Sequence, residues 1–189
     1  MDANTFTTRF QLSPLSIPKN RYRYPTKTKD AAVLVALIER EGSLDVLLTK
    51  RAAHLKHHPG QISFPGGKIE QSDKSIIATA LRESHEEIGL SPEKVSVIGQ
   101  LKPYHTITGY LVTPIVAIIK GDVDYQNDPN EVDEIFQVPL KHFLDPNNRH
   151  TVEVFHKGKS HHVHFMPYKQ YNIWGATAAM MEDLILHIM

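Results

Sequence analysis

The order of strand-like and helix-like segments restricts the folds open to this chain. Apolar runs rich in β-branched residues predict strands before, between and after the helical segments, at residues 31–39, 44–51, 95–101, 111–119, 151–155 and 161–165. Polar turns separate the first two runs and the last two, which indicates two hairpins. We expect a final short strand at residues 171–174 and a terminal helix over residues 175–189. Because no strand–helix–strand rhythm repeats, the order predicts an α+β domain with a mixed sheet rather than a doubly wound one.

Length and composition allow one hydrophobic core. A chain of 189 residues with 41% hydrophobic content can bury a sizeable core, so residues 31–189 are expected to form a single domain. Residues 1–30 contain several prolines and show little periodicity. This pattern indicates an N-terminal arm that is laid over the domain or partly disordered.

Charge and cysteine content narrow the class of partner. The 21 Lys and Arg residues balance the 21 Asp and Glu residues, which argues against non-specific binding of nucleic acid or an anionic membrane. The chain has no cysteine and no signal-peptide pattern at its start, and its longest apolar runs are too short to span a bilayer. We therefore expect a cytoplasmic protein without a nucleic-acid or membrane partner.

An amphipathic helix is predicted in the segment that leads to Gly89. Its apolar or small face is formed by Ile77, Ala80, Leu81, Ser84 and Ile88. Ser72 or Asp73 can cap the start of this helix, and Gly89 can end it.

Three glutamates occupy the opposite side of the predicted helix. On a helical wheel, Glu83, Glu86 and Glu87 fall within one sector of roughly 100° that points away from the core face. Like charges at this spacing cost about 0.2–0.5 kcal/mol per pair, so a cation is expected nearby. Clustered carboxylates suit Mg²⁺. The alternative is a solvated acidic face that pairs with Arg82 and lysines.

A glycine turn precedes the helix directly. In residues 64–67, a proline and two glycines allow the backbone to approach a ligand closely, and exposed N–H groups there can meet phosphate oxygens. The glycine turn therefore favours the interpretation of the acidic face as a site for a metal ion and a phosphate.

The turn and the helix together resemble the Nudix box. The family pattern is G-x5-E-x7-R-E-U-x-E-E-x-G-U, where U is apolar, and it is matched by Gly67, Arg82, Glu83, Glu86, Glu87, Gly89 and Leu90. Asp73 stands at the position of the first glutamate, one extra residue precedes Arg82, and Ser84 replaces the first U. These departures resemble the variant of the box in the coenzyme A pyrophosphatase branch.

Two further segments resemble that branch. Residues 47–67 are similar to its upstream signature LLTxR[SA]x3Rx3GxxxFPGG, with Lys56 in place of an arginine. Lysine keeps the charge but loses the bidentate phosphate geometry. Residues 171–181 also look like the C-terminal end of the branch.

The resemblance implies a Nudix-like fold, a mixed β-sheet sandwiched between helices, and a metal-dependent diphosphatase. The implied reaction splits coenzyme A or its derivatives into 3′,5′-ADP and 4′-phosphopantetheine or its acyl form. Glu83, Glu86 and Glu87 would hold Mg²⁺ or Mn²⁺, and Arg82 would orient a box glutamate. Glu131 is the preferred further carboxylate, while Asp133, Glu134 and the box glutamates stay open as the general base.

Substrate contacts are expected on both sides of the glycine turn. The candidates are Arg51, Lys56, His57, His58, Gly66, Gly67 and Lys68. Two alternative functions stay open: hydrolysis of another nucleoside diphosphate derivative such as ADP-ribose, and a non-catalytic nucleotide-binding module. Tyr171 and Trp174 are expected in the core or in the interface of a homodimer rather than as a stacking platform for a base.

Overall fold

The computed structural model describes residues 1–14, 28–156 and 159–189. Its strands are β1 (Lys29–Arg40), β2 (Ser43–Arg51), β3 (Ile62–Ser63), β4 (Gly66–Lys68), β5 (Val95–Gln100), β6 (Tyr104–His105), β7 (Tyr110–Ile119), β8 (Val132–Pro139), β9 (His150–His156) and β10 (Lys159–Phe165). Its α-helices are α1 (Ala3–Leu12), α2 (Ile76–Ile88), α3 (Leu140–Leu144) and α4 (Ala176–Ile188). Single 3₁₀ turns occur at Pro92–Lys94 and Pro146–Asn148.

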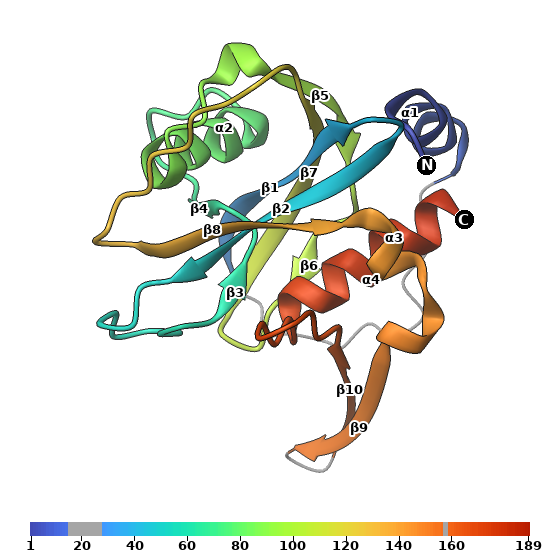
Figure 1. The fold of residues 1–189 in the computed structure, drawn as a ribbon. Coiled ribbons are helices and arrows are strands. Elements are labelled where there is room, and N and C mark those ends of the chain that lie inside the picture. The colour runs from blue at the N-terminus through green and yellow to red at the C-terminus, as the bar shows by residue number, and fades with distance from the viewer. Residues whose placement is uncertain (15–27, 157–158) are drawn as a thin grey trace.

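A mixed sheet lies between two layers of helices (Figure 1). The strands of its main path run in the order β3-β2-β1-β7-β5, with β4 on β1, β6 on β7 and β8 on β2. The β1–β7 pair is parallel, while the other pairs in this sheet are antiparallel. The α+β class and the mixed sheet predicted from the sequence are confirmed.

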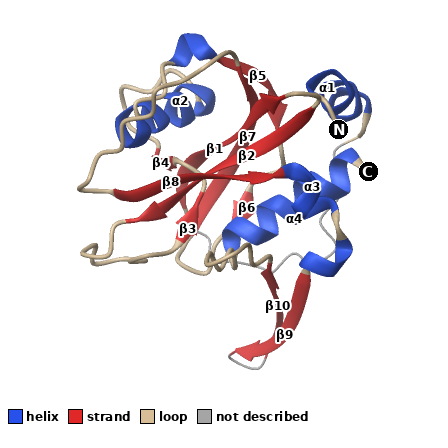
Figure 2. Cartoon of the chain, in the orientation of Figure 1, coloured by secondary structure: helices blue, strands red, loops and turns tan. Residues whose placement is uncertain are grey.

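Central strand β1 serves two cores, because alternate side chains of a strand point to opposite faces of the sheet. Val35 and Leu37 belong to the core under α1, α3 and α4, whereas Leu34 and Ala36 belong to the core under α2. All four side chains are fully buried. Helix α2 is therefore fixed to the opposite face of the sheet from the two terminal helices (Figure 2).

The two predicted hairpins are observed as β1–β2 and β9–β10, and the terminal helix is observed as α4. The predicted strand at 171–174 is wrong. Only isolated bridges occur there, between Tyr168 and Tyr171 and between Phe165 and Trp174. Trp174 stacks on Phe165 and is 41% exposed, so it does not lie in the core.

Helix α1 was not expected in the N-terminal segment. Asp2 caps it by accepting a 2.8 Å hydrogen bond from the backbone N–H of Thr5. Phe6 and Phe10, four residues apart, are buried in the same core as α4. At least this part of the expected arm is packed helix, while residues 15–27 lie outside the described residues. Strand β8 was also not predicted.

Candidate active site

Helix α2 begins at Ser75 and ends at Gly89. The Ser75 hydroxyl accepts a 3.1 Å hydrogen bond from the backbone N–H of Ala78. Gly89 adopts a left-handed conformation with φ of 68°, and its N–H donates to the carbonyl of His85. The predicted C-terminal glycine is confirmed, but the predicted cap at Ser72 or Asp73 is wrong, because Asp73 binds another side chain.

Glycines 66 and 67 let the turn pass close to the helix and the sheet. A Cβ atom on Gly66 would lie 2.3 Å from the carbonyl oxygen of Ala32, and one on Gly67 would lie 2.4 Å from the carboxylate of Glu83. A side chain at either position would displace its neighbour. The two glycines therefore bring the backbone of strand β4 against the acidic side of α2.

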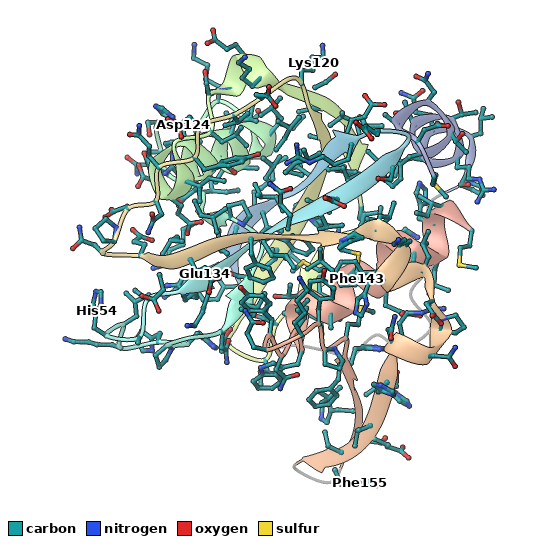
Figure 3. The ribbon with its side chains drawn as sticks, in the orientation of Figure 1. His54, Lys120, Asp124, Glu134, Phe143 and Phe155 are labelled. Atoms are coloured by element: carbon teal, nitrogen blue, oxygen red, sulfur yellow. The ribbon has the colours of Figure 1, made fainter. Side chains whose placement is uncertain are left out.

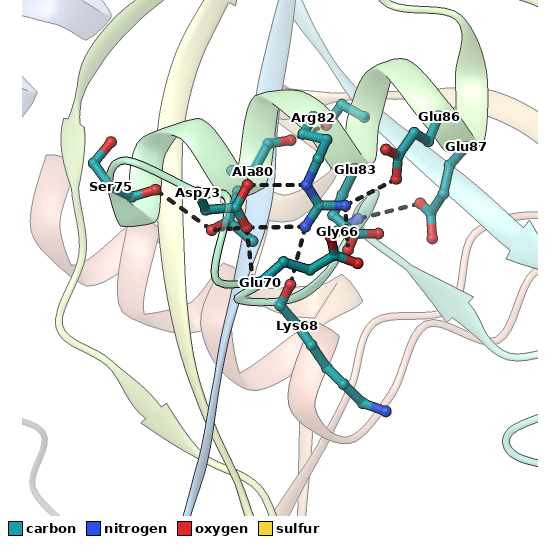
Figure 4. A network of polar contacts seen from close by, with 12 residues as sticks. Gly66, Lys68, Glu70, Asp73, Ser75, Ala80, Arg82, Glu83, Glu86 and Glu87 are labelled. Atoms are coloured by element: carbon teal, nitrogen blue, oxygen red, sulfur yellow. Dashed lines mark hydrogen bonds and ion pairs between the residues drawn. The ribbon is translucent and has the colours of Figure 1, made fainter.

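Asp73 and Arg82 organise the acidic side (Figure 4). Arg82 Nε and Nη2 donate to the two Asp73 carboxylate oxygens at 2.9 and 3.0 Å. The same Nη2 donates to the Lys68 carbonyl, and Nη1 donates to Glu83 Oε1 at 3.0 Å and Glu86 Oε2 at 2.9 Å. Arg82 thus joins the turn after β4 to two glutamates of the box.

Glu87 points into the protein, which the helical wheel did not predict. It is 4% exposed, and its Oε2 accepts a 3.1 Å hydrogen bond from the backbone N–H of Gly66. The glycine turn covers it, a contact that no local periodicity could reveal. Burial raises the pKa of Glu87 to about 8, opposed by the Gly66 N–H and Arg51, while Glu131 and Glu83 raise it further.

Glu83 and Glu86 differ in exposure. Burial raises the pKa of Glu83, and its contacts with Arg82 oppose that rise. The Glu86 side chain is 56% exposed and reaches Arg82 from solvent. The three box glutamates therefore span a gradient from buried Glu87 to exposed Glu86.

These carboxylates fit a hard divalent cation by donor chemistry, because Mg²⁺ and Mn²⁺ prefer oxygen ligands. Their like charges also oppose one another in the low-dielectric space beside the turn. In the described ranges, however, no three acidic or histidine side chains converge closely enough to hold an ion as they stand. Glu83 and Glu86 share Arg82 Nη1, and Glu87 turns to Gly66.

The structure brings Arg51 and Glu131 to the box. The Glu131 carbonyl accepts a 2.9 Å hydrogen bond from the backbone N–H of Ala52, and the charges of Arg51 and Glu131 both act on Glu87. The two competing carboxylates have other partners: Asp133 pairs with Lys50 at 3.4 Å, and Glu134 accepts a short hydrogen bond from the Tyr171 hydroxyl. Of the three candidates on this segment, Glu131 is the one whose charge raises the pKa of Glu83 and Glu87.

Of the remaining predicted contacts, Lys56, His57 and His58 lie on the loop between β2 and β3 that carries His54 (Figure 3), and Lys68 is the last residue of β4. Lys56 and His57 are exposed. His58 has a φ of 55°, and its Nδ1 is 2.7 Å from Gln61 Oε1. Lys68 is exposed, and its Nζ lies 5.9 Å from the centroid of the Tyr110 ring. In this arrangement none of the four contacts a box glutamate through its side chain.

Sequence reasoning missed the partner of Arg82 and the role of Tyr171. Asp73 occupies the position of the first box glutamate, and that placement was the available signal for the Asp73–Arg82 pair. Tyr171 stacks on Phe136 with ring centroids 3.7 Å apart while it donates to Glu134. No sequence pattern indicated this contact between the segment before α4 and strand β8.

In the part of the chain that the structure describes, none of the helices has the length and apolar character needed to cross a membrane.

Comparison with known proteins identifies the family of the chain. Residues 28–176 match the model of the NUDIX domain. The chain is 41% identical over 183 residues to the uncharacterized Nudix hydrolase NudL of Enterobacter sp. (strain 638), covering 97% of this chain and 93% of that protein. The NudL of Escherichia coli O1:K1 / APEC is 40% identical with the same coverage.

Solved structures share the fold. The Nudix hydrolase RenU from M. smegmatis superposes with a TM-score of 0.53 at 24% identity, covering 67% of this chain and 79% of that chain. A C. elegans Ap4A hydrolase in a binary complex gives a TM-score of 0.51 at 20% identity, covering 59% and 80%. With most of its length matched by the family model and by the NudL proteins, the chain belongs to the Nudix hydrolase family and is a diphosphatase.

Proposed function

We propose that the substrate is coenzyme A or one of its derivatives, and that the products are 3′,5′-ADP and 4′-phosphopantetheine or its acyl form. One observation carries this proposal. Residues 47–67 and the box, the two segments that resemble the coenzyme A branch, meet in one site: the Gly66 N–H donates to Glu87 Oε2 at 3.1 Å, and the charge of Arg51 acts on Glu87. Their contact is expected if both recognise the same diphosphate.

Glu83, Glu86 and Glu87 would hold Mg²⁺ or Mn²⁺. When bound, the ion would offset the charge of the diphosphate and lower the pKa of an attacking water. Arg82 holds Glu83 and Glu86 until the ion binds. Exposed Glu86 can leave Arg82 at little cost, because a solvated ion pair contributes about 1 kcal/mol or less.

Glu131 is the proposed general base, because it lies outside the helix, its charge raises the pKa of the buried Glu87, and it forms no ion pair among the described residues. It would accept a proton from the attacking water. Arg51 would contact a phosphate oxygen of the substrate. Lys56, His57, His58 and Lys68 stay proposed as outer contacts. A cytoplasmic location, a homodimer and the absence of a nucleic-acid or membrane partner stay predictions.

A product panel with Mg²⁺ and with Mn²⁺ tests the substrate. Coenzyme A, an acyl-coenzyme A, ADP-ribose and a dinucleoside polyphosphate are each incubated with the protein, and the nucleotide products are identified by chromatography. We expect 3′,5′-ADP from the first two at the highest kcat/KM. Preference for ADP-ribose or the dinucleotide would favour the alternative Nudix substrate. Binding without any product would indicate the non-catalytic module.

A further inference from the structure

The connection from β7 to β8 passes over α2 before it enters β8 (Figure 1). Val123 and Tyr125 pack against the core under α2. The backbone N–H of Gln126 donates to the carbonyl of Ile88 at 3.1 Å, and that of Asp128 donates to the carbonyl of Glu87 at 2.9 Å. The connection is thus tied to the last turn of the helix, at the residue whose carboxylate is buried in the site.

A tight turn then leads from Asp128 to Glu131. The Asp128 carbonyl accepts from the N–H groups of Glu131 and Val132, at 3.0 and 2.8 Å. Its carboxylate Oδ1 accepts from the backbone N–H and from the side-chain amide of Asn130, each at 2.9 Å. Asp128 therefore binds Glu87 with its N–H group and folds the turn with its two other polar groups.

The turn from Asp128 to Glu131 keeps the negatively charged Glu131 close to Glu87 in spite of their repulsion. Glu131 and Glu87 are both carboxylates, and each repels the other in the space beside the buried helix end. Their proximity needs a support other than their own interaction. Hydrogen bonds on both sides of the turn provide this support. Before the turn, the Asp128 N–H donates to the Glu87 carbonyl, and after it, the Ala52 N–H donates to the Glu131 carbonyl.

We propose that Asp128 is a positioning residue for the diphosphatase reaction, which sets the Glu131 carboxylate opposite Glu87. This inference rests on the proposed function, because it takes Glu131 as the base. Asp128 itself acts through the turn. Its side chain is already engaged by both donors of Asn130.

Kinetics of three variants test the proposal. Asp128→Ala removes the Oδ1 acceptor and is expected to lower kcat at least about 10-fold while KM changes less than about twofold. Asp128→Asn keeps an acceptor oxygen and should retain kcat within about threefold. Asp124→Ala is the matched control, because Asp124 is an exposed carboxylate of the same connection whose side chain forms no hydrogen bond or ion pair with another described residue. It should behave like the wild type.

A double variant separates positioning from general damage. If Asp128 acts through Glu131, then Asp128→Ala/Glu131→Gln should be no slower than Glu131→Gln alone. If the loss of kcat in the double variant equals the product of the losses in the two single variants, the proposal is overturned. An Asp128→Asn variant as slow as Asp128→Ala would also overturn it. All rates are measured on whichever diphosphate the product panel shows to be hydrolysed. A different substrate would therefore overturn the coenzyme A assignment without touching this inference.

Amide hydrogen exchange gives a readout that needs no substrate. Asp128→Ala should speed exchange of the amides of residues 130–132 at least about 10-fold relative to Asp124→Ala, with helix α2 unchanged. Unchanged exchange at the turn would show that the Asp128 side chain does not hold it, and would overturn the proposal even if no activity were measurable.

Discussion

Asp73 and Arg82 form a two-bond pair, with Nε 2.9 Å from Oδ1 and Nη2 3.0 Å from Oδ2. Because two of its nitrogens are held in this way, the guanidinium plane of Arg82 is fixed. Its third nitrogen then faces Glu83 and Glu86. The aspartate that replaces the usual box glutamate therefore sets the resting arrangement of two proposed metal ligands.

Loss of this pair should cost stability. Hydrogen bonds from Arg82 hold the pKa of Asp73 well below its usual range. Such a group stabilises the fold above about pH 4 and loses that contribution as the pH falls. Asp73→Asn should lower the free energy of unfolding by about 2 kcal/mol at pH 7, the scale of a charged hydrogen bond. Urea titrations should show the difference narrowing below about pH 4.

Glu70→Gln is the control for that measurement. Glu70 lies on the same turn and binds Asp73 through its backbone: its N–H donates to Asp73 Oδ2 at 2.9 Å, and its carbonyl accepts from the Asp73 N–H at 3.1 Å. Its side chain is expected to contribute less than about 0.5 kcal/mol. Equal losses in the two variants would contradict the role assigned to the Asp73 carboxylate.

The box glutamates should be required for turnover rather than for folding. Glu86→Gln and Glu87→Gln are each expected to lower kcat at least about 100-fold at saturating Mg²⁺ or Mn²⁺, since each removes a carboxylate that would hold the metal ion during the reaction. Glu87→Gln should keep its melting temperature, because burial already disfavours the charged form of Glu87. Near-wild-type activity in both variants would show that α2 is not the catalytic element.

Arg51 should affect substrate choice if it reads the 3′-phosphate of coenzyme A. Loss of a charge-assisted hydrogen bond worth about 1.5–3 kcal/mol changes a ratio of kcat/KM by about 10- to 150-fold. The preference for coenzyme A over dephospho-coenzyme A should shrink by that factor in Arg51→Ala. Steady-state rates for both substrates, repeated with Lys56→Ala, measure it. Since Arg51 also faces Glu87, an equal loss on both substrates would instead assign Arg51 to site organisation.

Asp183 on α4 should limit stability near neutral pH. Burial, together with neighbouring Glu182, raises the pKa of Asp183 to about 6. Ionisation of Asp183 therefore lowers the free energy of unfolding. This effect is absent below about pH 4 and is complete above about pH 6. Asp183→Asn should raise the free energy of unfolding by about 1–2 kcal/mol at pH 7, where partial exposure limits the gain. The gain should vanish near pH 4. Asp124→Asn, an exposed control, should change stability little at either pH.

Local patterns predicted much of this fold. The two apolar runs at residues 31–39 and 44–51, separated by a polar turn, indicated the hairpin, and Ala80 and Ile88 indicated the buried face of α2. Gly89 marked the end of the helix because its left-handed φ suits glycine. Each of these signals lies within one element.

The remaining features depend on contacts between distant segments. Helix α1 carries only Phe6 and Phe10 as buried anchors in a largely polar sequence, so its periodicity is weak. Glu87 lies on the polar sector of the wheel, and its burial follows from the glycine turn that packs over it. The link between Glu131 and the box depends on a connection that crosses the helix, which no spacing in the sequence encodes.

The parallel pairing of β1 with β7 sets the order in which the molecule can assemble. Strand β7 ends about 80 residues after β1, and α2 lies between them in the chain. At a synthesis rate of about 5–20 residues per second, the ribosome would release β7 roughly 4–16 seconds after β1. During that interval only part of the sheet surface that α2 will cover has been synthesised, so α2 can pack in its final position only late in synthesis.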